Sequence, residues 1–176
     1  MKERFEKLLL SVKRNGMDKL LEFIRKSDFY TAPASTRFHG AYEGGLLEHS
    51  LNVYDCLDKK TSGSEHNIWK ELLNTEISND SIVIVSLLHD LCKTYYYTTE
   101  MRNKKNESGV WVQVPFYTVD DRIPYGHGEK SVMMIEEYIK LLPVERYAIR
   151  WQDVYKRQHP VPASHLRQPC HVIHGF

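Results

Sequence analysis

Residues 79–93 read Asn-Asp-Ser-Ile-Val-Ile-Val-Ser-Leu-Leu-His-Asp-Leu-Cys-Lys, and this stretch decides the fold. Asn79 and Asp80 are residue types that cap helix N-termini, and they predict a helix over residues 81–91. Periodicity alone also fits a buried β-strand, because the run is continuously apolar and rich in β-branched residues. Since a capping pair precedes the run, the helix is the favoured interpretation.

The segments on both sides of this stretch have helical periodicity. Apolar residues recur at i, i+3, i+4 and i+7 over residues 5–12 and 17–24, with Gly16 between them, which predicts two helices or one interrupted helix. Residues 31–36 are a loop by composition. Further apolar stripes predict helices over residues 46–57 after Gly44-Gly45, over residues 132–142, and from a first-turn Pro143 through Val144, Tyr147, Ala148 and Trp151.

Two β-prone runs lie between these helices, at residues 95–99 and 110–114, and the polar residues 103–109 separate them. The expected fold is therefore all-α, a helical bundle with a small β-hairpin inserted around residues 95–115. The aromatic residues of the hairpin could stack a nucleic-acid base while its cations attract phosphate; the alternative is a packed face with a solvated tip. The residues concerned are Tyr95, Tyr96, Tyr97 and Trp111 as aromatics, and Arg102, Lys104 and Lys105 as cations.

Composition limits the class of protein. The chain has 176 residues, enough for one ordinary domain, and 24 Lys and Arg balance 23 Asp and Glu, so global charge favours neither a nucleic-acid nor a membrane partner. Residues 1–7 have no secretory character, and the apolar run 82–85 is far too short to cross a bilayer. We expect a cytoplasmic protein. Three cysteines without a CxxC pair indicate reduced thiols rather than a thiolate zinc site or a disulfide scaffold.

Four residues could carry metal chemistry: His49, the adjacent pair His89 and Asp90, and His127. Imidazole and carboxylate together suit divalent ions such as Zn²⁺, Mn²⁺, Fe²⁺ or Mg²⁺. Adjacent residues on a helix diverge by about 100°, so both His89 and Asp90 reach an ion only if it lies over the helix flank. The alternative is that these are hydrogen-bonded core histidines and an ordinary helix-end carboxylate.

Two motifs carry a family resemblance: Gly-Gly-Leu-Leu-Glu-His-Ser at residues 44–50, and Leu-Leu-His-Asp-Leu-Cys-Lys at residues 87–93. Over residues 38–151 the chain resembles the HD-domain metal-dependent phosphohydrolases, whose signature is a His, a later His-Asp pair and a closing Asp. The lead-in at residues 38–43 is similar to that of HD-type 3′–5′ exoribonucleases and small bacterial or phage HD hydrolases. The resemblance implies an all-helical fold, which strengthens the helical interpretation of residues 81–91.

The same resemblance implies roles for individual residues. His49, His89 and Asp90 match the first three metal ligands, and His127 resembles the histidine that serves a second ion, although it could be a helix-start histidine without a ligand role. Lys93 resembles the family lysine near the phosphate; alternatively it is a solvated cation at a helix C-terminus. Asp90 and Lys93 are the expected catalytic residues. The expected cofactor is one or two divalent ions, chosen among Mn, Mg, Fe, Ni and Zn.

The chain departs from the family pattern at its C-terminal end. Gln152 follows Arg150-Trp151 where related sequences have a histidine, and Asp153 is the single aspartate after Asp121, too early for the closing ligand. Residues 152–176 fit no helical or strand period, so we expect residues 1–151 to form an incomplete helical domain with an aperiodic tail. Residues 153–158 also resemble translated sequencing-adaptor DNA, which leads to the hypothesis that the native sequence stops near Trp151.

The function that follows is metal-dependent hydrolysis of a phosphoester in a phosphorylated small molecule, a nucleotide, or a short RNA or DNA, with no membrane partner. A different class remains open, a degenerate HD domain that binds a nucleotide or a protein partner without turnover. A structural metal site without a substrate is the third alternative. Metal content and phosphatase activity, measured together, separate the three.

Overall fold

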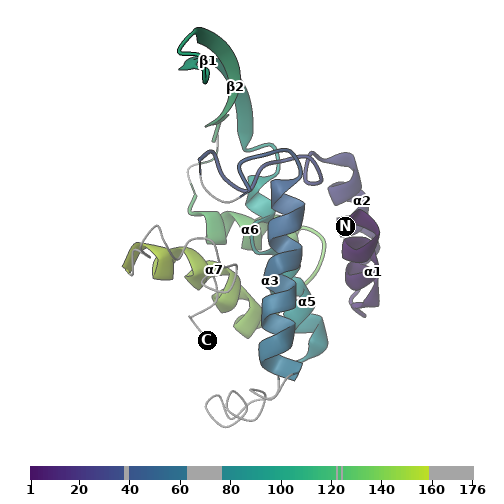
Figure 1. The fold of residues 1–176 in the computed structure, drawn as a ribbon. Helices are drawn as coiled ribbons and strands as arrows, with labels where there is room; N and C mark the ends of the chain where they lie inside the picture. The colour runs from purple at the N-terminus through teal and green to yellow at the C-terminus, as the bar shows by residue number, and fades with distance from the viewer. Residues whose placement is uncertain (38–39, 63–76, 122, 124, 159–176) are drawn as a thin grey trace.

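The computed structural model describes residues 1–37, 40–62, 77–121, 123 and 125–158. The described part is mostly helical and contains one antiparallel two-stranded hairpin, as predicted (Figure 1). Its elements, in chain order, are α1 (Lys2–Ser11), α2 (Met17–Lys26), α3 (Gly45–Ser62), α5 (Asn79–Leu88), the 3₁₀ helix η1 (Leu91–Lys93), β1 (Tyr97–Lys105), β2 (Trp111–Val119), α6 (His127–Glu136) and α7 (Pro143–Gln158).

Helices α3 and α5 lie side by side in the middle of the molecule (Figure 1). Helices α1 and α2 flank this pair on one side, where α1 contacts both α3 and α5. Helices α6 and α7 pack against each other on the other side, with α6 against η1 and α7 against α5. The apolar stripes of the sequence meet in this arrangement as one core, and α5 is at its centre.

Helix α5 is buried on all sides, which explains why its sequence shows no amphipathic period. Every residue from Ser81 to Leu88 is buried. The N-cap is Ser78, one residue before the predicted capping pair, and its side chain accepts a hydrogen bond from the Ser81 N–H over 3.1 Å. The predicted helical extension to Leu91 is wrong, because Asp90 leaves the helical conformation with φ −105° and ψ 22°. The chain then forms η1.

The two N-terminal helices are separate, as the position of Gly16 predicted. Gly16 adopts a left-handed φ of 93° and caps the start of α2. The aromatic ring of Phe5 on α1 packs against Phe29 and Tyr30 just after α2, with ring centroids 5.0 and 5.9 Å apart. These contacts fix the loop that leads to α3.

The last two helices differ from the prediction in their ends and faces. The helix predicted over residues 132–142 begins earlier and forms α6, and its predicted end at residue 142 is wrong because α6 stops at Glu136. The Glu136 carboxylate accepts the Leu141 N–H of the turn that follows. Helix α7 starts at Pro143 as predicted but continues to Gln158, so the predicted break after Trp151 is wrong. Residues 159–176 of the predicted tail lie outside the described part.

Helix α7 turns a charged residue inward rather than its apolar stripe. The Glu145 side chain is fully buried, whereas Tyr147 and Trp151 are more than half exposed. Arg14 donates two hydrogen bonds of 2.6 Å to the Glu145 carboxylate, and Ser81 Oγ donates a third over 2.7 Å. This network ties α5 and α7 to the turn before α2.

The hairpin is longer than predicted and projects away from the helical body (Figure 1). Its nine residue pairs run from Tyr97 opposite Val119 to Lys105 opposite Trp111. Tyr97 and Trp111 therefore lie at opposite ends of the hairpin, roughly 26 Å apart for a rise of about 3.3 Å per residue. They cannot form one platform for stacking a base. Lys105 instead lies over the Trp111 ring, 5.3 Å from its centroid.

The cysteines only partly match the prediction. Cys92 is a buried free thiol, as expected. Cys56 is disulfide-bonded, so the prediction of reduced thiols is wrong at this position. Pairing depends on distance in the folded chain, which the spacing of cysteines in the sequence does not give. None of the helices in the described part of the chain combines enough length and apolar character to cross a bilayer.

Candidate metal centre

Three side chains converge between α3 and the end of α5. His49 lies one turn into α3, His89 directly follows α5, and Asp90 precedes η1. All three are buried, with 5%, 3% and 4% of their surfaces exposed. Buried polar side chains of this kind require partners, and here their ligand atoms face one another.

The ligand atoms form a nearly regular triangle. His49 Nε2 lies 3.3 Å from His89 Nε2, and Asp90 Oδ2 lies 3.5 Å from His49 Nε2 and 3.2 Å from His89 Nε2. A tetrahedral ion holds ligands about 2.0–2.1 Å away and therefore about 3.3 Å from one another. The three atoms thus have the spacing of neighbouring ligands on a single ion. The donor set, two imidazole nitrogens and one carboxylate oxygen, also suits a divalent transition metal.

The tautomer of His89 suits metal binding. Its Nδ1 lies 2.8 Å from the main-chain carbonyl oxygen of Ser86. A carbonyl oxygen only accepts hydrogen bonds, so Nδ1 carries a proton, and Nε2 is the ring nitrogen that can bind a metal. A backbone partner of this kind fixes the orientation of a ligating histidine.

His89 and Asp90 point to the same place where α5 ends. On a continuous helix the two side chains would diverge by about 100°. His89 keeps helical dihedral angles, φ −55° and ψ −33°, whereas Asp90 does not. The Asp90 carboxylate nevertheless lies beside the imidazole of His89, with Oδ2 3.2 Å from Nε2.

A close backbone contact fixes the start of α3, and with it His49. A Cβ atom added to Gly45 would lie 2.1 Å from the carbonyl oxygen of Gly40, so no other residue fits there without a shift. Gly44, just before the helix, has a left-handed φ of 80°. The two glycines let Gly40 pack directly against the first turn of α3, and the segment of residues 31–37 supplies a main-chain group to the site, the Ala34 carbonyl.

Lys93 is bound into the site rather than solvated. Its Nζ donates to Asp90 Oδ2 and to the carbonyl oxygen of Ala34, both over 2.7 Å, and its side chain is only 11% exposed. The ammonium group therefore lies next to the carboxylate oxygen that belongs to the triangle. Its position places a fixed positive charge at the edge of the candidate centre.

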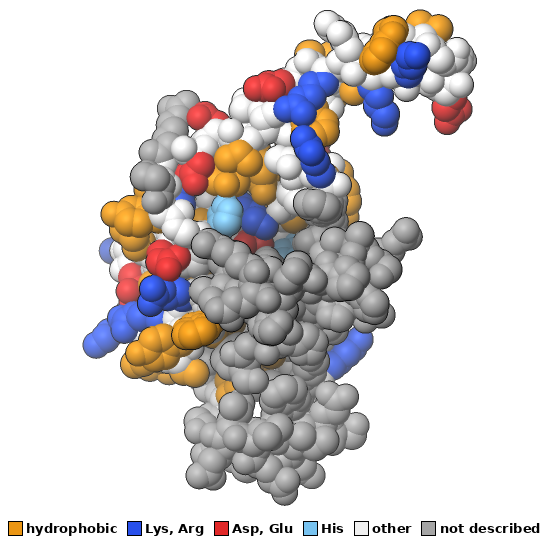
Figure 2. All heavy atoms as spheres, turned by 90° about the vertical axis from the view of Figure 1, so that its left-hand side faces the viewer, with side chains coloured by type: hydrophobic (Ala, Val, Ile, Leu, Met, Phe, Trp, Pro, Cys, Tyr) orange, Lys and Arg blue, Asp and Glu red, His pale blue; other side chains and the backbone are white. Residues whose placement is uncertain are grey.

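His127 lies close to the motif but outside the triangle. It begins α6, and its Nδ1 and Nε2 each lie 3.4 Å from a neighbour, Cys92 Sγ and Tyr96 Oη respectively. Its predicted role with a second ion stays a prediction. Near the middle of the face shown in Figure 2, histidine side chains lie beside basic and acidic ones, below a group of hydrophobic side chains.

The fourth ligand of the family signature has no counterpart in this group. Among the described residues, His49, His89 and Asp90 are the set whose ligand atoms cluster. Gln152 and Asp153 belong to α7, and their side chains lie outside the described part. Three of the four predicted ligands are thus brought together, and the closing aspartate is not identified.

Sequence analysis missed the main-chain groups that orient the site. The carbonyl oxygens of Ser86 and Ala34 hold His89 and Lys93, and no side-chain motif signals such partners. It also missed the role of Tyr97, whose hydroxyl donates to the same Ala34 carbonyl over 3.1 Å. The sequence indicated only that Tyr97 belongs to a β-prone aromatic run.

Comparison with known proteins gives one informative similarity. No family model matches the chain, and no solved structure matches it. The chain is 32% identical over 89 residues to the dihydroneopterin 2′,3′-cyclic phosphate phosphodiesterase of Methanocaldococcus jannaschii, a match that covers 51% of this chain. It covers only 31% of the length of that protein. The chain is therefore a mostly helical protein with a buried His-His-Asp group and a distant similarity to a phosphodiesterase.

Proposed function

We propose that this protein is a divalent-metal-dependent phosphodiesterase of the HD type, with His49, His89 and Asp90 as metal ligands. The observation that carries the proposal is the triangle of ligand atoms, whose sides of 3.2–3.5 Å match neighbouring ligands on one ion. The similarity to a phosphodiesterase supports the reaction class independently of this geometry.

In this proposal, some side chains bind the metal ion and another compensates the charge of the phosphate. A divalent ion at this site supplies Lewis acidity, which lowers the pKa of a bound water molecule to about 7 and offsets charge on phosphoryl oxygens. Asp90 contributes the negative charge that balances the ion, and the two imidazoles bind it through Nε2. Lys93 is held 2.7 Å from Asp90 Oδ2, where its ammonium group can meet the phosphate.

The proposed substrate is a phosphorylated small molecule, which we favour over RNA or DNA. By its name, the relative acts on the cyclic phosphate of dihydroneopterin. The hairpin aromatics that could bind a nucleic acid are split between its two ends, and the net charge of the chain is only +1. A small cyclic phosphodiester therefore fits the present observations better than a polymer does.

Metal content and turnover on the same preparations test the proposal. The protein is loaded in turn with Mn²⁺, Mg²⁺, Fe²⁺, Ni²⁺ and Zn²⁺, and bound metal is measured by elemental analysis. Hydrolysis of bis(p-nitrophenyl) phosphate and of a 2′,3′-cyclic phosphate is followed with each metal. We expect about one or two ions per chain and metal-dependent hydrolysis, which Asp90→Asn abolishes.

Two results would overturn the proposal in different ways. Metal binding without hydrolysis of either substrate would indicate the binding module that the missing fourth ligand suggests. Failure to bind any of the five metals would mean that His49, His89 and Asp90 form only a hydrogen-bonded core group.

A further inference from the structure

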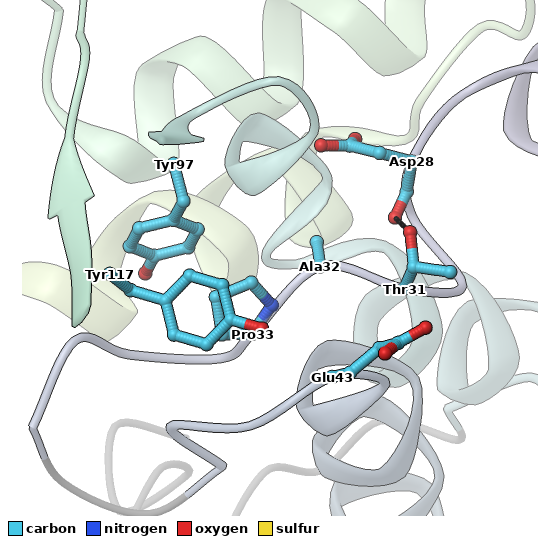
Figure 3. Close-up of a pocket in the computed structure, with 7 residues that line it drawn as sticks. All are labelled: Asp28, Thr31, Ala32, Pro33, Glu43, Tyr97 and Tyr117. Atoms are coloured by element: carbon cyan, nitrogen blue, oxygen red, sulfur yellow. Dashed lines mark hydrogen bonds between the residues drawn. The ribbon is translucent and has the colours of Figure 1, made fainter. Parts of the chain in front are cut away.

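A second concave site lies beside the candidate metal centre, between the base of the hairpin and the start of α3 (Figure 3). It is an open pocket of about 230 Å³. Figure 3 shows the two tyrosine rings with Pro33 on one side, and two acidic side chains with Thr31 on the other. The residues that line it are Asp28, Thr31, Ala32, Pro33, Glu43, Tyr97 and Tyr117.

Hydrogen bonds connect the pocket to the metal centre. The hydroxyl of Tyr97 and the Nζ of Lys93 both donate to the carbonyl oxygen of Ala34. Lys93 in turn donates to Asp90 Oδ2, an atom of the ligand triangle. Three hydrogen bonds in series thus lead from the aromatic side of the pocket to the candidate metal site. One compact molecule could contact both.

The aromatic side of the pocket is rigid and uncharged. Burial, reinforced by the negative charge of Asp90, raises the pKa of Tyr97, so its hydroxyl stays protonated. The Ala34 carbonyl that it donates to also fixes the ring. Tyr97 and Tyr117 present flat π-faces next to the pyrrolidine ring of Pro33. Such a surface binds a flat ring system by stacking and apolar contact.

The opposite side of the pocket offers hydrogen-bond acceptors. Ionised carboxylates accept hydrogen bonds and cannot donate them, so Asp28 and Glu43 require N–H or O–H donors. One Asp28 oxygen accepts the Tyr95 N–H over 2.8 Å. Within the described part of the chain, neither carboxylate is in an ion pair, and the exposed Glu43 carboxylate accepts no hydrogen bond. Two adjacent N–H groups on a ligand could pair with one such carboxylate in parallel.

We infer that this pocket binds the heterocycle of the substrate, a flat ring that carries an amino group beside a ring N–H, as the 2-amino-4-oxo rings of pterins and guanine do. The ring lies against Tyr97 and Tyr117, and its donors meet Glu43, with Asp28 as the second acceptor. The phosphate then extends past Lys93 to the metal centre. This inference rests on the proposed function for the phosphate end, whereas ring binding itself needs neither metal nor turnover.

Ring binding is measured directly, in EDTA and without phosphate, by the fluorescence change of 6-hydroxymethylpterin and 6-hydroxymethyllumazine. The two compounds differ at C2, where the pterin has an amino group and the lumazine an oxo group, and at N1, which carries a hydrogen only in the lumazine. We expect the pterin to bind at least tenfold more tightly, because the lumazine oxo group faces a carboxylate and repels it. Glu43→Gln should weaken pterin binding about tenfold and reduce the preference for the pterin over the lumazine. Glu107→Gln, on the exposed hairpin turn, is the matched control and should change neither value.

Equal affinity for the two compounds, or pterin binding that Glu43→Gln and Asp28→Asn both leave unchanged, would overturn the inference. Each variant keeps the shape of the side chain, and circular dichroism checks its fold. Hydrolysis of bis(p-nitrophenyl) phosphate, which has no N–H donor, reports the proposed function separately. Lost pterin preference in Glu43→Gln, with both pterin binding and hydrolysis unchanged in Glu107→Gln, is the expected pattern. A preference for the pterin without any hydrolysis would support ring binding in the pocket and overturn the proposed phosphodiesterase activity.

Discussion

The Nδ1–H of His89 donates to the carbonyl oxygen of Ser86 over 2.8 Å, within the last turn of α5. The imidazole is therefore oriented by the helix that ends beside it, before any ligand arrives. Its Nε2 faces His49 and Asp90, 3.3 and 3.2 Å away. A ligand set fixed in this way loses little conformational entropy when it binds a cation.

Removing one member of the triangle should remove the metal. We expect His89→Ala and Asp90→Asn each to lower divalent-metal affinity at least tenfold, because the two remaining groups cannot close the coordination sphere. Elemental analysis after gel filtration measures the bound metal. Wild-type metal content in Asp90→Asn would exclude Asp90 from the site.

The metal content of His127→Ala shows whether the protein binds one ion or two. If His127 serves a second ion, the variant should lose about one equivalent of metal while the first remains bound. Its ring nitrogens lie 3.4 Å from Cys92 and Tyr96, so the imidazole must turn to reach a second ion. Unchanged stoichiometry in His127→Ala would assign the residue a packing role.

Lys93→Ala should lower turnover far more than metal occupancy. We expect kcat to fall roughly 100-fold, because a fixed positive charge next to the phosphate is lost, while bound metal changes less than twofold. Steady-state kinetics on bis(p-nitrophenyl) phosphate, beside elemental analysis, make this comparison. Lys93→Arg keeps the charge and should retain part of the activity. Equal losses of metal and turnover in Lys93→Ala would show that Lys93 acts by holding Asp90.

Glu145→Gln should destabilise the protein by about 3 kcal/mol at pH 7, because it leaves Arg14 without its carboxylate partner inside the fold. The Arg14 side chain is 17% exposed and that of Glu145 is fully buried, so solvent replaces little of the lost interaction. Urea unfolding at pH 7, followed by circular dichroism, measures the difference. A loss below about 0.5 kcal/mol would mean that the pair contributes no net stability.

The same glutamate makes stability depend on pH. Burial opposes its ionisation, but hydrogen bonds from Arg14, Ser81 and the Leu142 N–H outweigh burial and hold the pKa of Glu145 below its ordinary 4.5. A lowered pKa in the folded state gives stability that is full above the ordinary value and is lost as the pH falls through the folded value. Wild-type protein should therefore lose more unfolding free energy between pH 6 and pH 3 than Glu145→Gln does. An equal loss of unfolding free energy in the two proteins over this pH range would contradict the lowered pKa of Glu145.

Gly45→Ala should destabilise the fold by about 1–3 kcal/mol, since the added methyl group meets the Gly40 carbonyl and one of the two segments must shift. Because α3 begins at Gly45, the shift should also displace His49 and reduce metal affinity. Gly109→Ala is the control for metal binding alone, because nothing lies within 4 Å of a Cβ there but its left-handed φ of 77° itself strains an alanine. Thermal unfolding and elemental analysis compare the variants. Equal metal binding in both would show that Gly45 does not position His49 for the metal.

Most of the secondary structure could be predicted, because the apolar residues repeat with the period of a helix and because glycine and proline mark where helices are interrupted or begin. Gly16 separates α1 from α2, and Pro143 begins α7. The buried face of α7 could not be predicted, since an inward Glu145 becomes favourable only with Arg14, 131 residues away in the sequence. The end of α5 was placed three residues too late for a similar reason, as no local signal marks the turn at Asp90.

The candidate site was predicted as a set of residue types but not as a geometry. The residue pattern singled out His49, His89 and Asp90, and the family resemblance added Lys93. The first three contact one another in the structure, and Lys93 contacts Asp90. The sequence could not show that His89 and Asp90 converge where α5 ends. Nor could it show the pocket near Tyr97, because its lining residues come from three segments without any shared pattern.

The projecting hairpin has few contacts with the helical core, and its residues from Thr98 to Gln113 are exposed. Its amide protons can therefore exchange with solvent through local fraying, independently of the rest of the molecule. The amides of Ile82 to Leu88 in α5 exchange only when the core itself opens. Tyr97 lies at the junction between these two regimes. Fast amide exchange in the hairpin thus ends at Tyr97, which lines the pocket. A ligand bound in the pocket would therefore slow amide exchange at the base of β1.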